Sequence, residues 1–288
     1  MEISSVQDYI SAIERLGFKY TIEQLTPHGR RLKTPRFIFR GHSNHEKYKV
    51  IPGILRYSVL QYSPLVEYNI LSNFIIDSCR YLRDVPTGDI LSWLEIAQHF
   101  GVPTRLLDFT SNPLVALYFA CESKSEANAS VWMVNTSAYN MIFSFDRANY
   151  AAGAERIANQ IIRDEIVEFD SYDATSHSDP RKYSQYPLIY QPHYREERMS
   201  QQSSMFMLWG ADRRALTDMI QEEYFMNDSD DGQNGKCGII GNLIIPFEKK
   251  EKLLSQLDLC GINQKVIYPG LEGVGRYIKN SVDFSVRR

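Results

Sequence analysis

The chain has 288 residues, of which 43% are hydrophobic and 23% charged, and its formal net charge is −3. These values are ordinary for a soluble globular protein and allow either one large domain or two small ones. The net charge excludes a generally basic surface that would coat nucleic acid, although it leaves room for a local basic patch. No run of about eighteen apolar residues exists, and the N-terminus lacks the hydrophobic region of a signal peptide. We therefore expect a cytoplasmic protein with no membrane partner.

The predicted elements mix helices and strands without regular alternation, which favours an α+β fold over a doubly wound sheet. The first part of the chain predicts a helix at 5–16, a basic loop at 27–35, a strand at 36–40, helices at 64–83 and 89–99, a polar turn and a helix at 114–121. The middle part predicts a strand at 129–134, a helix at 150–163, a surface loop at 170–185, a strand at 188–190 and a short helix or loop at 195–202. The last part predicts a strand at 205–209, a disorder-like segment at 226–236, a strand at 238–245 and helices at 248–260 and 271–279.

The chain carries four cysteines and several histidines but no recognisable metal motif. The cysteines, which form no Cys-x-x-Cys pair, are Cys79, Cys121, Cys237 and Cys260. Free thiols in a reducing compartment fit this spacing best. His42 and His45 are close enough to share a metal, but nothing nearby completes a ligand shell. No phosphate loop, Gly-x-Gly-x-x-Gly, His-Glu-x-x-His or Gly-x-Ser-x-Gly motif is present either.

Two polar stretches carry the functional signal. The first is Phe39-Arg40-Gly41, at the end of a predicted strand, and the second covers residues 98–113, between two apolar helices. Polar groups crowded between core elements are costly unless they pair with one another or meet a ligand. The second stretch therefore predicts a functional turn. Asn112 followed by Pro113 is typical of a helix start, so an apolar and central helix should follow.

Arg40 has two interpretations. It is either a rim arginine paired with an acid or an anion clamp that grips a phosphate through two parallel hydrogen bonds. In the second case, Gly41 leaves space for the ligand to approach.

The polar residues of the second stretch also admit structural and functional interpretations. Arg105 and Asp108 lie three residues apart, and a buried ion pair that braces the turn is the favoured one. His99, near a helix end, is more typical of a capping or core histidine than of a catalyst. Thr110 and Ser111 can bond free backbone amides before the helix or hold ribose hydroxyls, and their spacing does not distinguish the two.

At these residues the chain resembles the FRG-domain family, named for the motif seen here as Phe39-Arg40-Gly41. The family pattern continues with a Tyr-x-x-x-Pro-x-x-x-Arg element, a helix that carries an acid, a long signature from Trp to Ala, and an Arg-x-x-x-Gln-x-Gly-x-Phe element in which Ser204 replaces the glycine here. The matching residues are Tyr48, Pro52, Arg56, Glu67, Trp93, Gln98, His99, Gly101, Pro103, Thr104, Arg105, Leu106, Leu107, Asp108, Thr110, Asn112, Pro113, Ala116, Leu117, Phe119, Ala120, Arg198, Gln202 and Phe206. The resemblance implies an FRG domain at 36–288 with a C-terminal strand and helices, preceded by an N-terminal helix and basic loop at 1–35.

A second, weaker resemblance is to arginine-type ADP-ribosyltransferases. They share the order of an apolar strand ending in Arg-Gly, a Thr/Ser turn, and a late strand with Gln or Glu at its start. The resemblance implies a single compact α+β domain whose mixed or antiparallel sheet is split around a cleft, with NAD as substrate and no metal. It places catalytic roles on Arg40, Gln202, Asp108 and His99, and cofactor binding on Arg40, Gly41, Arg105, Thr110, Ser111 and Arg198. Because Gln202 cannot act as a base, a nearby acid would have to assist, and Asp108, Glu67 and Glu272 are the candidates.

The first functional hypothesis is therefore an NAD-dependent ADP-ribosyltransferase of the bacterial or phage-conflict toxin type. Its acceptor would be RNA, DNA or protein, and a toxin of this type needs a neutralising protein partner. The basic residues Arg30, Arg31, Lys33 and Arg36 either guide an anionic acceptor or form a solvated loop. The alternatives are a non-catalytic module that binds a nucleotide or peptide, and an NAD glycohydrolase, for which the acceptor is water.

Overall fold

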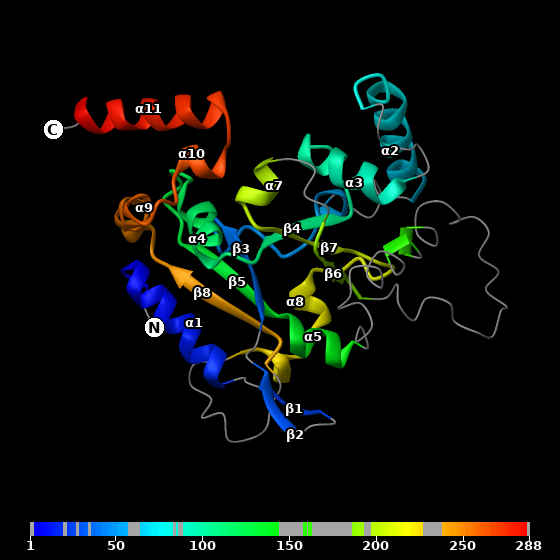
Figure 1. Ribbon diagram of the computed structural model, residues 1–288, viewed down its shortest axis with the longest axis horizontal. Helices are drawn as coiled ribbons and strands as arrows, with labels where there is room; N and C mark the ends of the chain where they lie inside the picture. The colour runs from blue at the N-terminus through cyan, green and yellow to red at the C-terminus, as the bar shows by residue number, and fades with distance from the viewer. Residues whose placement is uncertain are drawn as a thin grey trace.

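The computed structural model of the chain describes residues 3–19, 22–26, 29–33, 36–56, 64–82, 85, 89–143, 158–159, 161–162, 186–192, 197–226 and 238–286. Within these ranges it is an α+β protein built on one antiparallel sheet (Figure 1). The coarse fold class predicted from the sequence is therefore confirmed.

The sheet consists of two halves that meet at one residue pair. Its strand order is β6–β7–β4–β3–β5–β8, and every neighbouring pair is antiparallel. The strands are β3 (Phe37–His42), β4 (Leu106–Thr110), β5 (Ala129–Asn135), β6 (Leu188–Tyr190), β7 (Ser204–Leu208) and β8 (Ile240–Ile245). Between the central strands β3 and β4, the only register pair is Phe39–Thr110. The two strands therefore diverge immediately beyond this pair.

Helices bury both faces of the sheet, because side chains alternate between the faces along each strand. Phe39 and Met133 belong to a core that also contains α1 (Val6–Lys19), α4 (Pro113–Cys121) and α9 (Lys250–Leu259). Their sequence neighbours Ile38 and Val134 belong to a second core. The helices that contribute to this second core include α3 (Ile90–His99), α5 (Thr136–Ile142) and α8 (Leu216–Met219). Because α1 shares the first core, the N-terminal helix is part of the same packed body.

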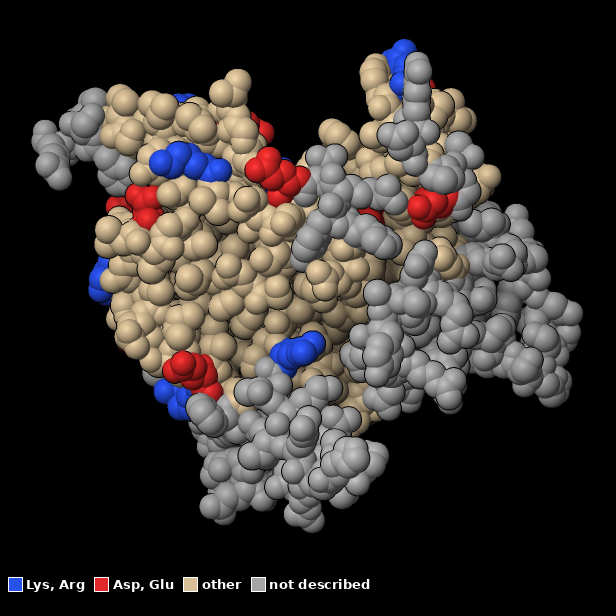
Figure 2. Space-filling model, in the orientation of Figure 1, with Lys and Arg blue, Asp and Glu red and all other residues tan. Residues whose placement is uncertain are grey.

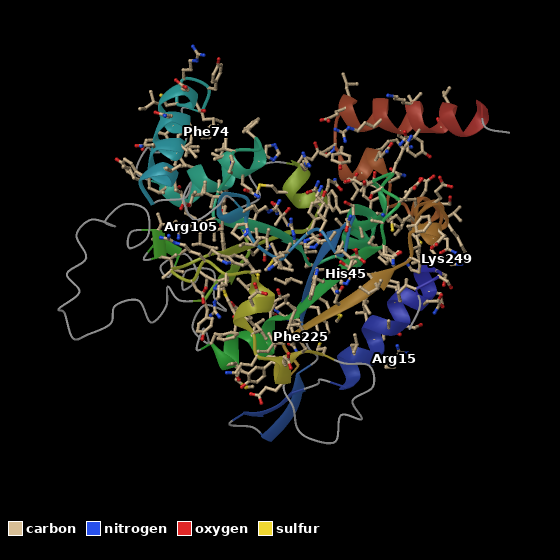
Figure 3. All side chains as sticks on the ribbon, turned by 180° about the vertical axis from the view of Figure 1, so that it is seen from behind. Arg15, His45, Phe74, Arg105, Phe225 and Lys249 are labelled. Atoms are coloured by element: carbon tan, nitrogen blue, oxygen red, sulfur yellow. The ribbon has the colours of Figure 1, made fainter. Side chains whose placement is uncertain are left out.

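The remaining elements lie at the ends of this body. In Figure 1, α2 (Pro64–Ser78) rises on one side and α10 (Gln264–Ile267) with α11 (Leu271–Val286) on the other, and α7 (Glu197–Gln201) lies between them. The hairpin of β1 (Ile22–Thr26) and β2 (Gly29–Lys33) lies at the opposite, lower end of the molecule in both ribbon views (Figures 1 and 3).

Several predicted elements match the observed ones, and the differences have clear causes. The strands predicted at 129–134, 188–190 and 205–209 correspond to β5, β6 and β7. Asn112 does cap α4, since its Oδ1 accepts a hydrogen bond of 2.9 Å from the Leu114 amide. By contrast, the expected polar turn contains strand β4, and the expected basic loop contains strand β2. In both cases pairing with a partner strand overrides a locally polar sequence.

Three sequence-based expectations lie outside the described residues. They are most of the helix expected at 150–163, the loop expected at 170–185 and nearly all of the disorder-like segment at 226–236.

Gly41 allows α4 to pack directly on β3. A Cβ atom at this position would lie 2.2 Å from the Ala116 carbonyl oxygen and 2.6 Å from the Ala120 amide nitrogen. The position that a Cβ atom of Gly41 would take is thus filled by the helix backbone, and the approach of a ligand to this glycine stays a prediction. The glycine is required because two backbones approach each other here.

We predict that Gly41→Ala destabilises the protein by about 1–3 kcal/mol, because α4 or β3 must move to accommodate the methyl group. Urea unfolding followed by circular dichroism measures this change. Gly275→Ala is the matched control, since a Cβ atom there meets nothing within 4 Å in the interior of α11. The control should be neutral or stabilising by up to about 1 kcal/mol. Equal unfolding midpoints for Gly41→Ala and the wild type would contradict the packing argument.

Candidate functional site

A cavity of about 510 Å³ opens where β3 and β4 diverge. Its walls come from β3, β4 and β7, from α3, α4 and α7, and from the segment after β3. Figure 2 shows the surface hollowed between the lobe that carries α11 and the lobe that carries α2, the side on which α7 lies in Figure 1. A volume of this size is typical of small-molecule sites.

The guanidinium of Arg40 spans the gap between the two sheet halves. Its Nη1 donates a hydrogen bond of 2.5 Å to the Asp108 carbonyl oxygen on β4, and its Nε donates one of 3.1 Å to Nε2 of His42. Burial lowers the pKa of Arg40 to about 10; the charge of Arg56 also lowers it, whereas Asp108 opposes the shift. Arg40 therefore remains a cation at neutral pH. In the described part of the chain, its Nη2 donates to no protein group.

His42 is a neutral hydrogen-bond acceptor for Arg40. Its side chain is buried, with a relative exposure of 4%. Burial and the charges of Arg40 and Arg56 lower the pKa of His42 to about 3. Since Nε2 accepts from Arg40, the proton of the neutral ring lies on Nδ1. The histidine thus orients the guanidinium without adding positive charge.

Asp108 is held by a short chain of side chains from α3 and the loop that follows it. Gln98 donates from Nε2 to Oδ2 of Asp108 at 2.7 Å and accepts at Oε1 from the Thr104 hydroxyl at 2.7 Å. The Thr104 hydroxyl in turn accepts from the Leu106 amide at 3.1 Å. Asp108 is exposed on the cavity wall, and its carboxylate keeps a fixed position there.

Arg105 pairs with Glu67 of α2, and the predicted pair with Asp108 is wrong. Two parallel hydrogen bonds of 2.8 and 2.7 Å join the Arg105 guanidinium to the Glu67 carboxylate, and Nη1 donates to the Trp209 carbonyl oxygen at 3.0 Å. Both side chains are only 2% exposed. Arg105 lies beneath α2 in Figure 3 and is not on the cavity wall. It therefore joins α2 to β4 and is not available to a ligand in the cavity.

Thr110 and Ser111 are used within the protein. The Thr110 hydroxyl donates to the Gln202 carbonyl oxygen at 2.6 Å and accepts from the Asn112 amide at 3.0 Å. Ser111 bonds the Ser203 carbonyl oxygen through its amide at 3.0 Å and does not line the cavity. These contacts favour the structural interpretation of both residues, because they tie β4 to the α7–β7 connection.

Gln202 and Glu122 converge on two consecutive residues near the C-terminus. The Gln202 side chain donates from Nε2 to the Ile267 carbonyl oxygen at 3.0 Å. The Tyr268 hydroxyl donates to both carboxylate oxygens of Glu122, at 2.8 and 3.1 Å. The ring of Tyr268 also contacts Arg198, whose Cζ lies 5.0 Å from the ring centroid. Gln202, Glu122 and Arg198 all line the cavity.

Seven of the predicted site residues line the cavity and two do not. Those on its wall are Arg40, Gly41, His99, Asp108, Thr110, Arg198 and Gln202, whereas Arg105 and Ser111 lie elsewhere. The acids Glu67 and Glu272 are also absent from the wall, since Glu67 pairs with Arg105 and Glu272 pairs with Arg276 on α11. Sequence reasoning missed His42, Glu95 and Glu122 as wall residues. Glu122 directly follows the apolar helix α4, and that abrupt change from apolar to acidic was the signal available for it.

Residues 35–129 match the family model of the FRG domain. The chain contains an FRG domain. No curated protein and no solved structure matches the chain. The matched range of the FRG domain includes β3, β4, α4 and the buried Arg105–Glu67 pair, and thus one wall of the cavity. Arg198, Gln202 and Tyr268 lie beyond it, so the extension of the domain to the C-terminal helices remains a prediction.

Neither a membrane span nor a metal cluster occurs in the described ranges around the FRG domain. No helix there has the length and apolar character needed to cross a bilayer. Nor do three or more His, Cys, Asp or Glu side chains of these ranges gather closely enough to hold a metal ion.

We predict that Glu67→Gln destabilises the FRG domain by about 3–5 kcal/mol, because it leaves the buried Arg105 charge without its carboxylate. Chemical unfolding provides the measurement. Glu272→Gln removes one carboxylate from an exposed pair with Arg276 and serves as the control, with an expected loss below about 1 kcal/mol. A loss for Glu67→Gln no larger than that of the control would show that the buried pair contributes little.

We also predict an acid-dependent loss of stability that arises from His42. An unfolded histidine takes up a proton as the pH falls through about 6.5, whereas His42 in the folded protein does so only near pH 3. The unfolded state therefore binds more protons between these values, and this site lowers the free energy of unfolding by about 1.4 kcal/mol per pH unit as the pH falls. His42→Gln keeps an acceptor for Arg40 and should flatten the slope between pH 6 and 4. An unchanged slope in that variant would assign the acid sensitivity to other groups.

Proposed function

We propose that the cavity binds NAD and that the protein transfers ADP-ribose from NAD to a macromolecular acceptor. The observation that carries this proposal is that Arg40, from the start of the FRG domain, and Gln202, from a distant part of the chain, line one cavity at the division of the sheet. The cation of Arg40 and the amide of Gln202 thus line the same cavity, and they follow each other in the sequence in the order that the resemblance to ADP-ribosyltransferases implies.

The arginines of the cavity are suited to a diphosphate. Arg40 keeps Nη2 for a ligand, while its other donors to His42 and Asp108 fix the plane of the guanidinium. Arg56 and Arg198 add two more guanidinium groups to the wall. Guanidinium groups bind phosphate oxygens through paired, charge-assisted hydrogen bonds. Since three carboxylates also line the wall, the site favours a ligand with both anionic and hydroxyl-bearing parts over a simple polyanion.

The remaining wall residues suit ribose and base. Nε2 of Gln202 donates to the Ile267 carbonyl oxygen, which leaves Oε1 of this cavity-lining residue as the acceptor for ribose hydroxyls. Tyr48 and Phe119 supply aromatic surface for a flat ring.

The chemistry requires positioning and negative charge more than a strong acid. Cleavage of the C1′–N bond of NAD passes through an oxocarbenium-like state, and the nicotinamide leaves as a neutral molecule that needs no proton. Carboxylates aimed at the developing cation lower the barrier electrostatically. Of the three acids predicted from the sequence, Asp108 alone lines the cavity, and its fixed position beside Arg40 suits this role.

The acceptor and any neutralising partner remain proposals. The hairpin that contains the basic stretch lies at the opposite end of the molecule from α7 and α10 (Figures 1 and 3). This location gives no support to a role as a guide to the cavity mouth. RNA, DNA and protein acceptors are therefore tested side by side.

The test uses NAD labelled in the adenylate phosphate, incubated with the protein and with RNA, DNA or lysate. Label on a macromolecule supports transfer, whereas free ADP-ribose indicates the glycohydrolase alternative. Binding of NAD without turnover would indicate a non-catalytic module and would refute the enzymatic proposal.

We predict that Arg40→Ala reduces NAD turnover well over tenfold, because it removes a charge-assisted contact worth about 1.5–3 kcal/mol. Arg80→Ala removes an arginine from an exposed position after α2 and is the matched control, which should keep wild-type turnover. A thermal melt confirms that both variants are folded. Full activity in a folded Arg40→Ala protein would exclude the clamp role.

A further inference from the structure

The proposed transfer requires a group that takes a proton from the acceptor, and the amide of Gln202 cannot do so. Three carboxylates line the cavity, namely Asp108, Glu95 and Glu122. Asp108 already has the electrostatic role beside Arg40 proposed above, and Glu95 is buried, at 3% exposure. Glu122 is exposed on the wall and is accessible to an incoming acceptor.

The end of α4 brings Glu122 to the Arg40 side of the cavity. The close backbone contact at Gly41 lies between β3 and the Ala116–Ala120 part of α4. Glu122 follows two residues later as the C-cap of the same helix. Its place relative to Arg40 is therefore set by a backbone contact and does not depend on a mobile loop.

Tyr268 contacts Glu122 directly, and Arg198, which lines the cavity, contacts the ring of Tyr268. The Tyr268 hydroxyl donates to both oxygens of Glu122, and the Tyr268 ring lies 4.4 Å from Cζ of Arg276 and 5.0 Å from Cζ of Arg198. The preceding residue, Ile267, holds Gln202 through its carbonyl oxygen. Two consecutive residues thus position the carboxylate and the amide together.

The surroundings of Glu122 raise the affinity of its carboxylate for a proton. Desolvation raises its pKa, while the Tyr268 hydroxyl, Arg276 and Arg198 oppose this shift. Burial raises the pKa of Tyr118, one helical turn before Glu122, and the charge of Glu122 raises it further. A negative charge at the C-terminal end of a helix is also unfavourable, because the helix dipole is negative there. A carboxylate whose negative charge is unfavourable for the stability of the fold is typical of a functional site.

Resting on the function proposed above, we infer that Glu122 is the general base of the transfer. As an oxygen or nitrogen of the acceptor attacks C1′ of the ribose, its proton passes to the Glu122 carboxylate. The C1′–N bond breaks at the same time, and its electron pair neutralises the pyridinium nitrogen of the departing nicotinamide. The proton then leaves Glu122 for solvent, so charge and atoms balance.

Glu122→Gln tests this role, since the amide still accepts a hydrogen bond from Tyr268 but takes up no proton. We expect nicotinamide release and macromolecular labelling to fall at least about a hundredfold, with the Kd for NAD changed less than about threefold. Glu126→Gln, at an exposed position of the loop after α4, is the matched control and should retain wild-type activity.

Tyr268→Phe supplies a second test, the pH profile of kcat, which would not shift if Glu122 had only a structural role. Loss of the hydroxyl removes a hydrogen bond that lowers the pKa of Glu122. The acid limb of the pH profile for kcat should therefore move to higher pH, while activity at alkaline pH is kept. An unmoved acid limb would contradict the assignment even if Glu122→Gln did not fold.

The possible outcomes separate this inference from the proposed function. If the wild type turns over NAD and Glu122→Gln does so within about threefold of the wild-type rate, the role of Glu122 is overturned but the proposed function is not. A wild-type protein that neither binds NAD nor releases nicotinamide would overturn both.

Discussion

The divergence of β3 and β4 is the constraint on which the cavity depends. The two strands share the Phe39–Thr110 pair, and beyond it a side chain takes over the role of a strand partner. The Asp108 carbonyl oxygen accepts from the Arg40 guanidinium, so a backbone acceptor of β4 is satisfied while the strands stay apart. The contact of Gly41 with α4 holds β3 on the other face. Were the strands to pair along their whole length, the cavity and the site would both be lost.

The polar residues around this opening serve two different purposes. Internal hydrogen bonds engage the side chains of Arg105, Thr110 and Thr104 and fix β4 relative to α2, α3 and α7. Arg40 and Glu122 are held by neighbours yet keep atoms that face the cavity. This division explains how a crowded polar segment can lie between core elements, because the buried groups are paired with one another and only the cavity-facing ones await a ligand. His42 contributes to the same arrangement by remaining uncharged beside two arginines.

Local sequence signals predicted those features that neighbouring residues decide. The Asn112 cap, the apolar helix α4 and strand β5 were predicted correctly, because capping and apolar patterning act within a few residues. Predictions failed where a distant partner decided the outcome. The segment around Asp108 forms a strand because β7 pairs with it, and Arg105 binds Glu67 because α2 folds back over β4. The contact between Glu122 and Tyr268 was not predicted, because no sequence pattern connects these two residues.

The sequence by itself determined that the chain carries the FRG motif and its long second signature, and that helices and strands mix in an α+β arrangement. It also singled out Arg40 and Gln202 as residues that belong together. Only the tertiary structure decided which polar groups face the cavity and which are buried as pairs. The physical reason is that burial and pairing of a charge depend on segments far away in the chain, whose approach follows from core packing and strand register.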